Sequence, residues 1–161
     1  MTARKVAVIG SFRRFYPQIL DAMAAFARES LAVTSPTGAA ITREGEFVRF
    51  ASDPQDWSNR EVQTATLVKM FAADIVFAVA PGGYVGRTTC YEIGRLCQAR
   101  KPVVFSDVPH DLPIACPATH VMPAAALARR LAAGETIAWV HESGDDFDAQ
   151  ERRLAARADT R

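Results

Sequence analysis

The stretch DIVFAVAPGGYVGRTTCYEIGRLCQARKPVVFSD (residues 74–107) decides the fold class. It begins with an unbroken apolar run at Asp74–Ala80, which is typical of a strand buried on both faces of a parallel sheet. A glycine-rich loop follows, and Thr89 to about Arg100 then carries apolar residues at helical spacing. A second apolar run, KPVVFSD (residues 101–107), predicts the next strand. The stretch therefore predicts a strand–loop–helix–strand unit, the building block of parallel sheets covered by helices.

The residues at the beginning of the chain repeat this alternation. KVAVIGSF (Lys5–Phe12) predicts a buried strand that ends near a glycine. Pro17 suits the first turn of a helix, and the apolar spacing after it predicts an amphipathic helix from Pro17 to about Ser30. LAVTSP (Leu31–Pro36) predicts a second strand that stops at proline.

Two further elements are expected between the second strand and Asp74. ITREGEFVRF (residues 41–50) alternates around Glu44-Gly45, which indicates a short hairpin. DPQDWSNREVQTATLVKMFAAD (residues 53–74) predicts a helix with Asp56 or a near neighbour as its N-cap.

The last third of the chain is less regular. Pro123–Ala133 predicts a short helix, and TIAWVHE (residues 136–142) is a candidate last strand. The whole pattern predicts one Rossmann-like or flavodoxin-like α/β sandwich with a mostly parallel sheet over residues 1–144. Residues 145–161 are charged and predict a C-terminal tail or a solvated helix.

Composition excludes several classes of partner. The chain has 161 residues, 49% hydrophobic and 23% charged, with a formal net charge of +1. Such a balance gives no electrostatic basis for binding nucleic acid. The apolar run near the start, VAVIG, is too short for a signal peptide or a membrane span, so we expect a cytoplasmic protein without a membrane partner.

The cysteines do not suggest a metal or a redox site. Cys90, Cys97 and Cys116 lack the spacing of a metal site, and any disulfide would leave one thiol over. We interpret them as small, mostly buried side chains. No metal and no organic cofactor is expected.

Three loops follow the expected strands at their carboxyl ends, where sheets of this class bind ligands near a topological switch point. They are GSFRRFY (residues 10–16), SPTGAA (residues 35–40) and PGGYVGRTT (residues 81–89).

The first loop combines a flexible turn with positive charge. Gly10 and Ser11 allow close approach of the backbone, and Arg13 and Arg14 suit a phosphate or a carboxylate. Tyr16 adds a stacking face or a hydroxyl. The alternative is an ordinary basic loop whose arginines point into water.

The third loop resembles neither a Walker loop nor a dinucleotide fingerprint, since GKS or GKT is absent and the glycine spacing differs. Gly82, Gly83 and Gly86 permit the backbone angles that a tight loop over a ligand needs. Thr88 and Thr89 would place hydroxyl donors beside free N–H groups at the start of a helix, which predicts an anion site.

Glu92, which follows this loop, has two interpretations. One is a catalytic carboxylate delivered to a ligand by the glycine-rich loop. The other is a capping box, in which Glu92 bonds back to the backbone N–H of Thr89. Both place the carboxylate in the first turn of the helix.

The residues quoted above are similar to one known family. GSFRRFY (residues 10–16), SPTGAAI (residues 35–41) and ADIVFAVAPGGYVGRTTCYEIGRLCQARKPVVFSD (residues 73–107) together resemble the nucleoside 2-deoxyribosyltransferase superfamily. The closest likeness is to its small members with a GSFR start and a GY(V/I)G…EIG loop. The resemblance covers Val6–Asp107.

This resemblance implies an enzyme that acts on a nucleoside or nucleotide as its small-molecule substrate. Glu92 would be the nucleophile that attacks C1′. From the residues themselves, we expect Tyr16 or Tyr84 to pack on the sugar or the base. The family also implies a homodimer or a higher homo-oligomer. The resemblance places the sugar and its 5′ group among the hydroxyls and arginines of two loops: Ser11, Arg13, Arg14, Thr88 and Thr89.

The sequence departs from the family pattern where the departing base should receive a proton. Thr66 stands where the family carries an aspartate, and Gly86 replaces an aspartate six residues before the glutamate. A general acid is needed for this step. The candidates to replace it are Asp53 and Asp56 in the preceding loop and Glu46 in the hairpin.

Three alternatives remain open from the sequence. The loop PGGYVGRTTCYE (residues 81–92) is also similar to the PGGxGTxxE loop of lysine-decarboxylase-like phosphoribohydrolases, with stretched spacing. A non-catalytic nucleotide sensor would keep the loops and lack the acid, as Thr66 suggests. A scaffold subunit would bind no small molecule.

Overall fold

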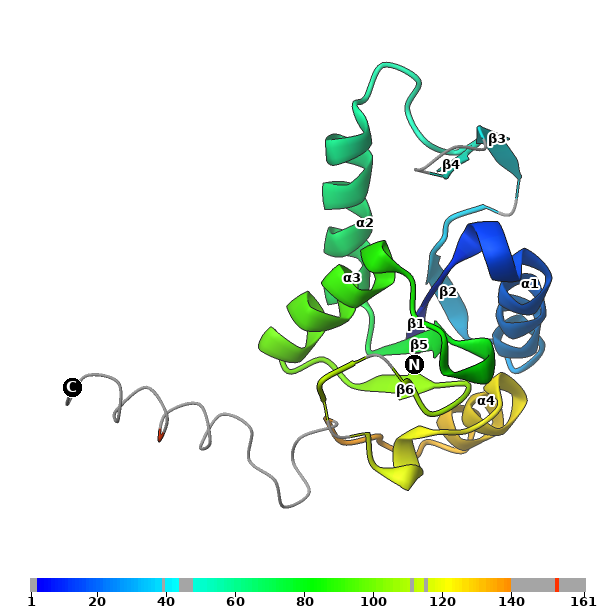
Figure 1. Ribbon diagram of the computed structural model, residues 1–161. Coiled ribbons are helices and arrows are strands. Elements are labelled where there is room, and N and C mark those ends of the chain that lie inside the picture. Colours follow the sequence, from blue (N-terminus) through cyan, green and yellow to red (C-terminus); the bar gives the residue numbers. More distant parts are fainter. Residues whose placement is uncertain are drawn as a thin grey trace, which may run out of the picture.

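The protein, in a computed structural model, is built on a four-stranded parallel sheet (Figure 1). The structure describes residues 3–38, 40–43, 48–110, 112–114, 116–139 and Arg153. The sheet contains β1 (Lys5–Gly10), β2 (Ala32–Ser35), β5 (Ile75–Val79) and β6 (Val103–Phe105). The strand order is β2-β1-β5-β6, and every neighbouring pair is parallel. This confirms the predicted α/β class with a parallel, flavodoxin-like sheet.

Helices cover both faces of the sheet. Helices α1 (Phe12–Arg28) and α4 (Ala124–Ala132) lie on one face, and α2 (Asn59–Ala72) and α3 (Arg87–Gln98) lie on the other (Figure 1). Two short 3₁₀ turns, η1 (Pro81–Gly83) and η2 (Ala118–His120), follow β5 and β6. The result is a three-layer sandwich of the doubly wound type.

The core has two halves because the side chains of each strand alternate between the two faces. On the first face, Phe77 of β5 contacts Phe26 of α1 edge-to-face, with ring centroids 5.5 Å apart. On the second face, Phe105 of β6 and Ile93 of α3 belong to one buried cluster. Every residue of β5 is buried, which explains the unbroken apolar run that predicts this strand.

The expected hairpin is confirmed. β3 (Ile41–Arg43) and β4 (Arg49–Phe50) pair antiparallel and form a small separate sheet. In Figure 1 this sheet lies above the carboxyl ends of the main strands, near the start of α1. Glu46, a candidate acid, falls outside the described residues.

The first helix begins earlier than the position of Pro17 predicts. α1 begins at Phe12, and Ser11 is its N-cap. The backbone leaves helical geometry at Phe15, with φ −128° and ψ 32°. Because proline has no N–H, it cannot continue an uninterrupted hydrogen-bond ladder, and the irregular Phe15 accommodates it. One extra turn therefore precedes the segment that the sequence predicts.

Other boundaries differ in detail. The N-cap of α2 is Ser58 rather than Asp56, and its side chain and that of Glu61 form a capping box. Over residues 136–139, the described part of the candidate last strand, the chain forms no strand. Residues 145–161 lie outside the described residues apart from Arg153, which is exposed.

No helix in the described ranges is both long enough and apolar enough to cross a membrane.

Candidate functional site

A cavity of about 590 Å³ opens at the carboxyl ends of β1 and β2, and the loop that follows β5 forms part of its wall. The neighbouring strands β1 and β5 lead to helices on opposite faces of the sheet, so the cavity borders the topological switch point. The turn after β1, the loop after β2, β4, α2 and the start of α3 all contribute to its wall. All three loops that the sequence singles out therefore border one space.

Glu92 is a buried carboxyl on this wall. It is 6% exposed and lines the cavity from the second turn of α3. Gln63 of α2 donates a hydrogen bond from Nε2 to Glu92 Oε1 over 2.9 Å. Burial raises the pKa of Glu92 from its ordinary 4.5 to about 7, and the bond from Gln63 opposes part of this rise. Near neutral pH the group is therefore divided between its acid and its carboxylate.

The capping-box interpretation of Glu92 is wrong. The N-cap of α3 is Gly86 and not Thr89, so Glu92 is the sixth residue of the helix, whereas a capping box needs a glutamate at the third. No side chain caps this helix end. Both glycine and threonine are common at N-caps, so the sequence alone did not fix the boundary.

The start of α3 presents polar groups to the cavity. Gly86, Arg87, Thr88 and Thr89 all line it. Thr89 is 4% exposed, and its hydroxyl forms no hydrogen bond to any described residue. This hydroxyl is not sealed from solvent, so it is available to a ligand in the cavity. Together with the positive end of the helix dipole, this group favours an anion or a sugar oxygen.

Ser35, at the end of β2, is a second buried residue that carries a hydroxyl on the wall. It is 3% exposed, lines the cavity and forms no side-chain hydrogen bond within the described part of the chain. Of the four polar or charged residues that are buried in the described chain, three line this cavity: Ser35, Thr89 and Glu92. Among the described residues, buried polar groups are thus concentrated at this cavity, a distribution typical of ligand sites.

The turn after β1 contributes Gly10, Ser11, Phe12 and Arg13 to the wall. Arg14, the next residue, does not line the cavity, and its guanidinium lies over the ring of Tyr84 at 4.2 Å from the centroid. Successive residues of a helix point about 100° apart, so the early start of α1 separates the two arginines. Tyr16 lies one turn further on and is also outside the wall.

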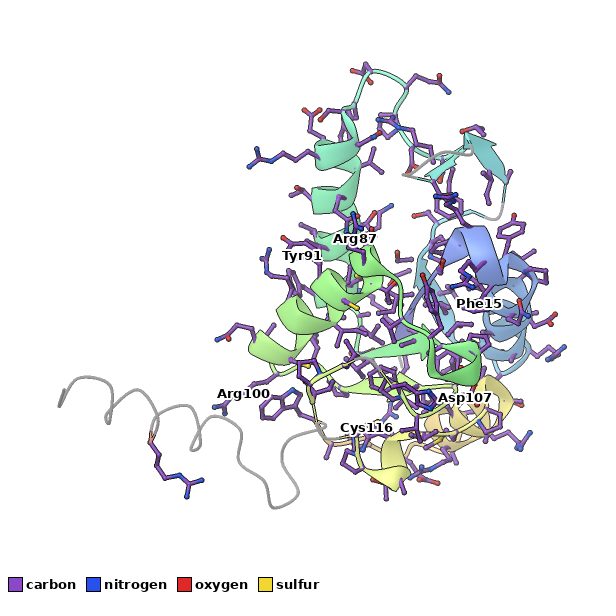
Figure 2. All side chains as sticks on the ribbon, in the orientation of Figure 1. Phe15, Arg87, Tyr91, Arg100, Asp107 and Cys116 are labelled. Atoms are coloured by element: carbon purple, nitrogen blue, oxygen red, sulfur yellow. The ribbon has the colours of Figure 1, made fainter. Side chains whose placement is uncertain are left out.

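Tyr84 lines the cavity, and two residues of α1 pack against its ring. Phe15 contacts it edge-to-face with centroids 5.8 Å apart, while Arg14 forms the cation–π contact. Arg14 therefore supports the ring of Tyr84, and its own side chain does not line the cavity. Phe15 of α1 and Arg87, the first residue of α3, are labelled in Figure 2.

Gly82 and Gly83 shape the loop after β5 but do not line the cavity. Gly83 has φ +79°, and a Cβ there would lie 2.5 Å from the carbonyl oxygen of Val108 and 2.7 Å from the His110 ring. Its carbonyl accepts a hydrogen bond from the backbone N–H of His110 over 3.1 Å. Glycine is required at this position because the backbone is left-handed and the neighbouring loop is close.

Gly83→Ala is therefore expected to lower the free energy of unfolding by about 2 kcal/mol, through strain and displacement of the 108–110 loop. Urea denaturation followed by circular dichroism measures this. Gly94→Ala is the control, since a Cβ at Gly94 meets nothing within 4 Å and the residue lies inside α3. It should stabilise or leave the protein unchanged; equal losses in both variants would contradict the argument.

Of the two candidate aspartates, the structure brings only Asp53 to the cavity wall. Its Oδ2 accepts a hydrogen bond from the backbone N–H of Phe50 over 2.8 Å, so it also anchors the end of β4. Asp56 is exposed and away from the cavity. The hydroxyl of Thr66, on the wall, donates to the carbonyl of Val62 within its own helix over 2.9 Å.

Several wall residues were missed by sequence reasoning. They include two cations and three polar side chains: Lys69, Arg87, Thr37, Asn59 and Gln63. Arg87 could have been found as the first residue of α3, and Gln63 as the residue one helical turn before Thr66. The cavity thus carries three cations, Arg13, Lys69 and Arg87, against the carboxyls of Asp53 and Glu92.

The three cysteines are less buried than the sequence suggests. Cys90, Cys97 and Cys116 are half-buried, form no disulfide, and pack against the core on the α2 and α3 face. Burial raises the pKa of the Cys97 thiol to about 11, so this thiol stays protonated near neutral pH. Within the described residues, no group of three or more His, Cys, Asp or Glu side chains could hold a metal ion.

A comparison of the sequence with protein-family models and with curated proteins finds no match. The resemblance to the nucleoside 2-deoxyribosyltransferase superfamily, and the assembly state that it implies, stay predictions.

Proposed function

We propose that the cavity binds a nucleoside or nucleotide and that the protein cleaves its base–sugar bond, with Glu92 as the nucleophile. The observation that carries the proposal is the carboxyl of Glu92, which is buried on the cavity wall at the switch point of the sheet. A protein buries a carboxyl without a cationic partner at a cost, and such groups are concentrated at functional sites.

The chemistry fits a carboxylate in this setting. Cleavage of an N-glycosidic bond builds positive charge on the sugar, which a carboxylate at C1′ stabilises or traps. Oxygen of Glu92 bonds to C1′ while the C1′–N bond breaks and its electron pair leaves on the base nitrogen. Water then attacks C1′, its proton passes to the group that protonated the base, and the C1′–O bond to Glu92 breaks to return the carboxylate. A second base in place of water would make the protein a transferase.

The departing base must also receive a proton. Among the described wall residues Asp53 is the second carboxyl, and it is the candidate donor, with water as the other source. Thr66 is unsuited to this step because a hydroxyl is too weak an acid and because it already donates to Val62.

The substrate's 5′ end is best placed at the start of α3. Arg13 and Arg87 offer charge, and Thr88 and Thr89 offer hydroxyls beside the helix dipole. This arrangement favours a 5′-phosphate over a free hydroxyl. Gly10 and Ser11 allow the turn after β1 to approach the same group.

The function is tested by incubating the protein with a panel of nucleosides and their 5′-monophosphates and measuring released base by chromatography. Release of base from at least one compound, with 5′-monophosphates preferred, is the expected result. No release from any compound, at pH values on both sides of 7, would overturn the enzyme proposal.

Arg13→Ala and Arg87→Ala are each expected to raise KM for a 5′-monophosphate about tenfold or more, since each removes a hydrogen bond to a charged group. KM for the matching nucleoside should change much less. Steady-state kinetics on both substrates measures the difference. Arg28→Ala is the control, because Arg28 is exposed in the last turn of α1. Equal effects on nucleoside and nucleotide would contradict the placement of the phosphate.

A second candidate is a nucleotide sensor without turnover. The observation that favours it is the absence of an acidic side chain from the described face of α2 that lines the cavity, where Gln63 and Thr66 stand instead. Thermal-shift measurements with the same panel distinguish the two. A nucleotide that stabilises the protein by several degrees and remains intact would support the sensor.

A further inference from the structure

The contact between α2 and α3 involves the side chain of Gln63, which the chemistry proposed above leaves without a role. We propose that Gln63 is a positioning residue whose side-chain amide holds the carboxylate of Glu92 toward the cavity for attack. This inference rests on the proposed function of Glu92.

Geometry supports this assignment. Gln63 Nε2 and Glu92 Oε1 are 2.9 Å apart, a normal hydrogen-bond distance, and both side chains line the cavity. Glu92 is 6% exposed and Gln63 is half-buried, so water competes poorly for this bond. No other described side chain donates to Glu92. The amide is therefore the contact that restricts the rotamer of the carboxylate.

Gln63 is itself firmly placed. It lies in the second turn of α2, just after the capping box in which Ser58 N donates to Glu61 Oε2 over 2.7 Å. A capped helix start limits fraying, so the first turns of α2 keep their register against α3. A catalytic carboxylate needs rigid support of this kind, because a small displacement of the reacting group lowers the rate by a large factor.

The amide also stabilises the ionised form of Glu92. It opposes the effect of burial on the pKa, and the charged groups that share the cavity make no comparable contribution. These are Arg13 of α1, Lys69 of α2, Arg87 of α3 and Asp53 before α2. Lys69 is engaged elsewhere, since its Nζ donates to Thr37 Oγ1 over 2.6 Å.

The chemistry of Glu92 explains why an amide suits position 63. An amide N–H donates to a carboxylate at every pH and carries no charge of its own. A carboxylate in place of Gln63 would repel Glu92 and keep one proton shared between the two groups. The amide thus keeps Glu92 available as a nucleophile in a site that would otherwise protonate it.

The test compares wild type with Gln63→Leu, Gln63→Glu and Gln63→Asn, and with the control Thr64→Ala. Thr64 is the exposed next residue of α2, and its hydroxyl bonds only within that helix. The measurement is the pH profile of kcat and kcat/KM for release of base. Gln63→Leu should move the acid limb of the profile upward by about one pH unit and lower plateau kcat about tenfold, with KM little changed.

Gln63→Glu should move the acid limb further, since it introduces a like charge. Gln63→Asn, whose amide is one methylene shorter, should retain part of the wild-type profile. Thr64→Ala should match wild type. Unchanged acid limbs in Gln63→Leu and Gln63→Glu would overturn the inference.

A second readout does not depend on turnover. The carboxyl of Glu92 is titrated by ¹³C NMR in glutamate-labelled protein, and Glu92→Gln identifies its signal. Gln63→Leu should raise the midpoint of this titration; an unchanged midpoint would overturn the role of Gln63. If wild type releases no base from any substrate, the proposed function fails, while the titration still decides whether Gln63 controls Glu92.

Discussion

Glu92→Gln is expected to lower the release of base by at least about a thousandfold, a loss typical of removing a nucleophile. The amide keeps the size of the side chain and can still bond to Gln63, so the cavity keeps its shape. Binding of the substrate, measured by calorimetry or thermal shift, should change little. The effect would therefore be on kcat rather than on KM.

The control for this variant is Asp21→Asn, which makes the same chemical change at an exposed position of α1. It should leave turnover unchanged. Turnover within a factor of about ten of wild type in Glu92→Gln would exclude Glu92 as the nucleophile. Loss of turnover together with loss of binding would instead assign it a binding role.

The second large effect concerns stability. In the folded protein Glu92 holds its proton up to a pH of about 7, whereas in the unfolded chain it loses it above its ordinary pKa of 4.5. Between these values the folded state binds more protons than the unfolded state, so stability falls as pH rises. Below pH 4.5 the penalty is absent, and above pH 7 it is complete, at about 3 kcal/mol.

Glu92→Gln lacks this titration. Its free energy of unfolding, relative to that of wild type, should therefore rise by about 3 kcal/mol between pH 4.5 and pH 8. Urea denaturation of both proteins across this range measures the difference. Parallel stability curves would show that the folded protein does not raise the pKa of Glu92.

Much of the fold could be predicted from the sequence because buried parallel strands leave a strong signal. The apolar runs in β1 and β5 and the glycines after them locate the carboxyl edge of the sheet. Since this edge is where such sheets bind ligands, the three bordering loops and Glu92 could be named before any coordinates. That prediction needed only the direction of the strands, because parallel strands place all their carboxyl ends at one edge of the sheet.

The finer geometry of the site could not be predicted, because it depends on helix phase and on contacts between distant residues. Because α1 begins at Phe12 and not near Pro17, Arg13 lines the cavity while Arg14 stacks on Tyr84. The bond between Gln63 and Glu92 joins residues 29 positions apart on different helices. No local pattern records such a contact.

The wall of the cavity has two origins, and this bears on how the protein could be re-engineered. Glu92 stands on a helix packed against the sheet, whereas Phe50 reaches the cavity from the small hairpin sheet and touches Phe12 edge-to-face, with centroids 5.0 Å apart. Arg49, beside it, ties β4 to the start of α2 through Asn59. The segment between β2 and α2 is therefore the part of the wall in which changes of length or sequence would reshape the cavity without moving Glu92. Under the proposed function, a loop library in this segment would keep Asp53 and vary its neighbours, so that the compounds admitted change while both carboxyls remain.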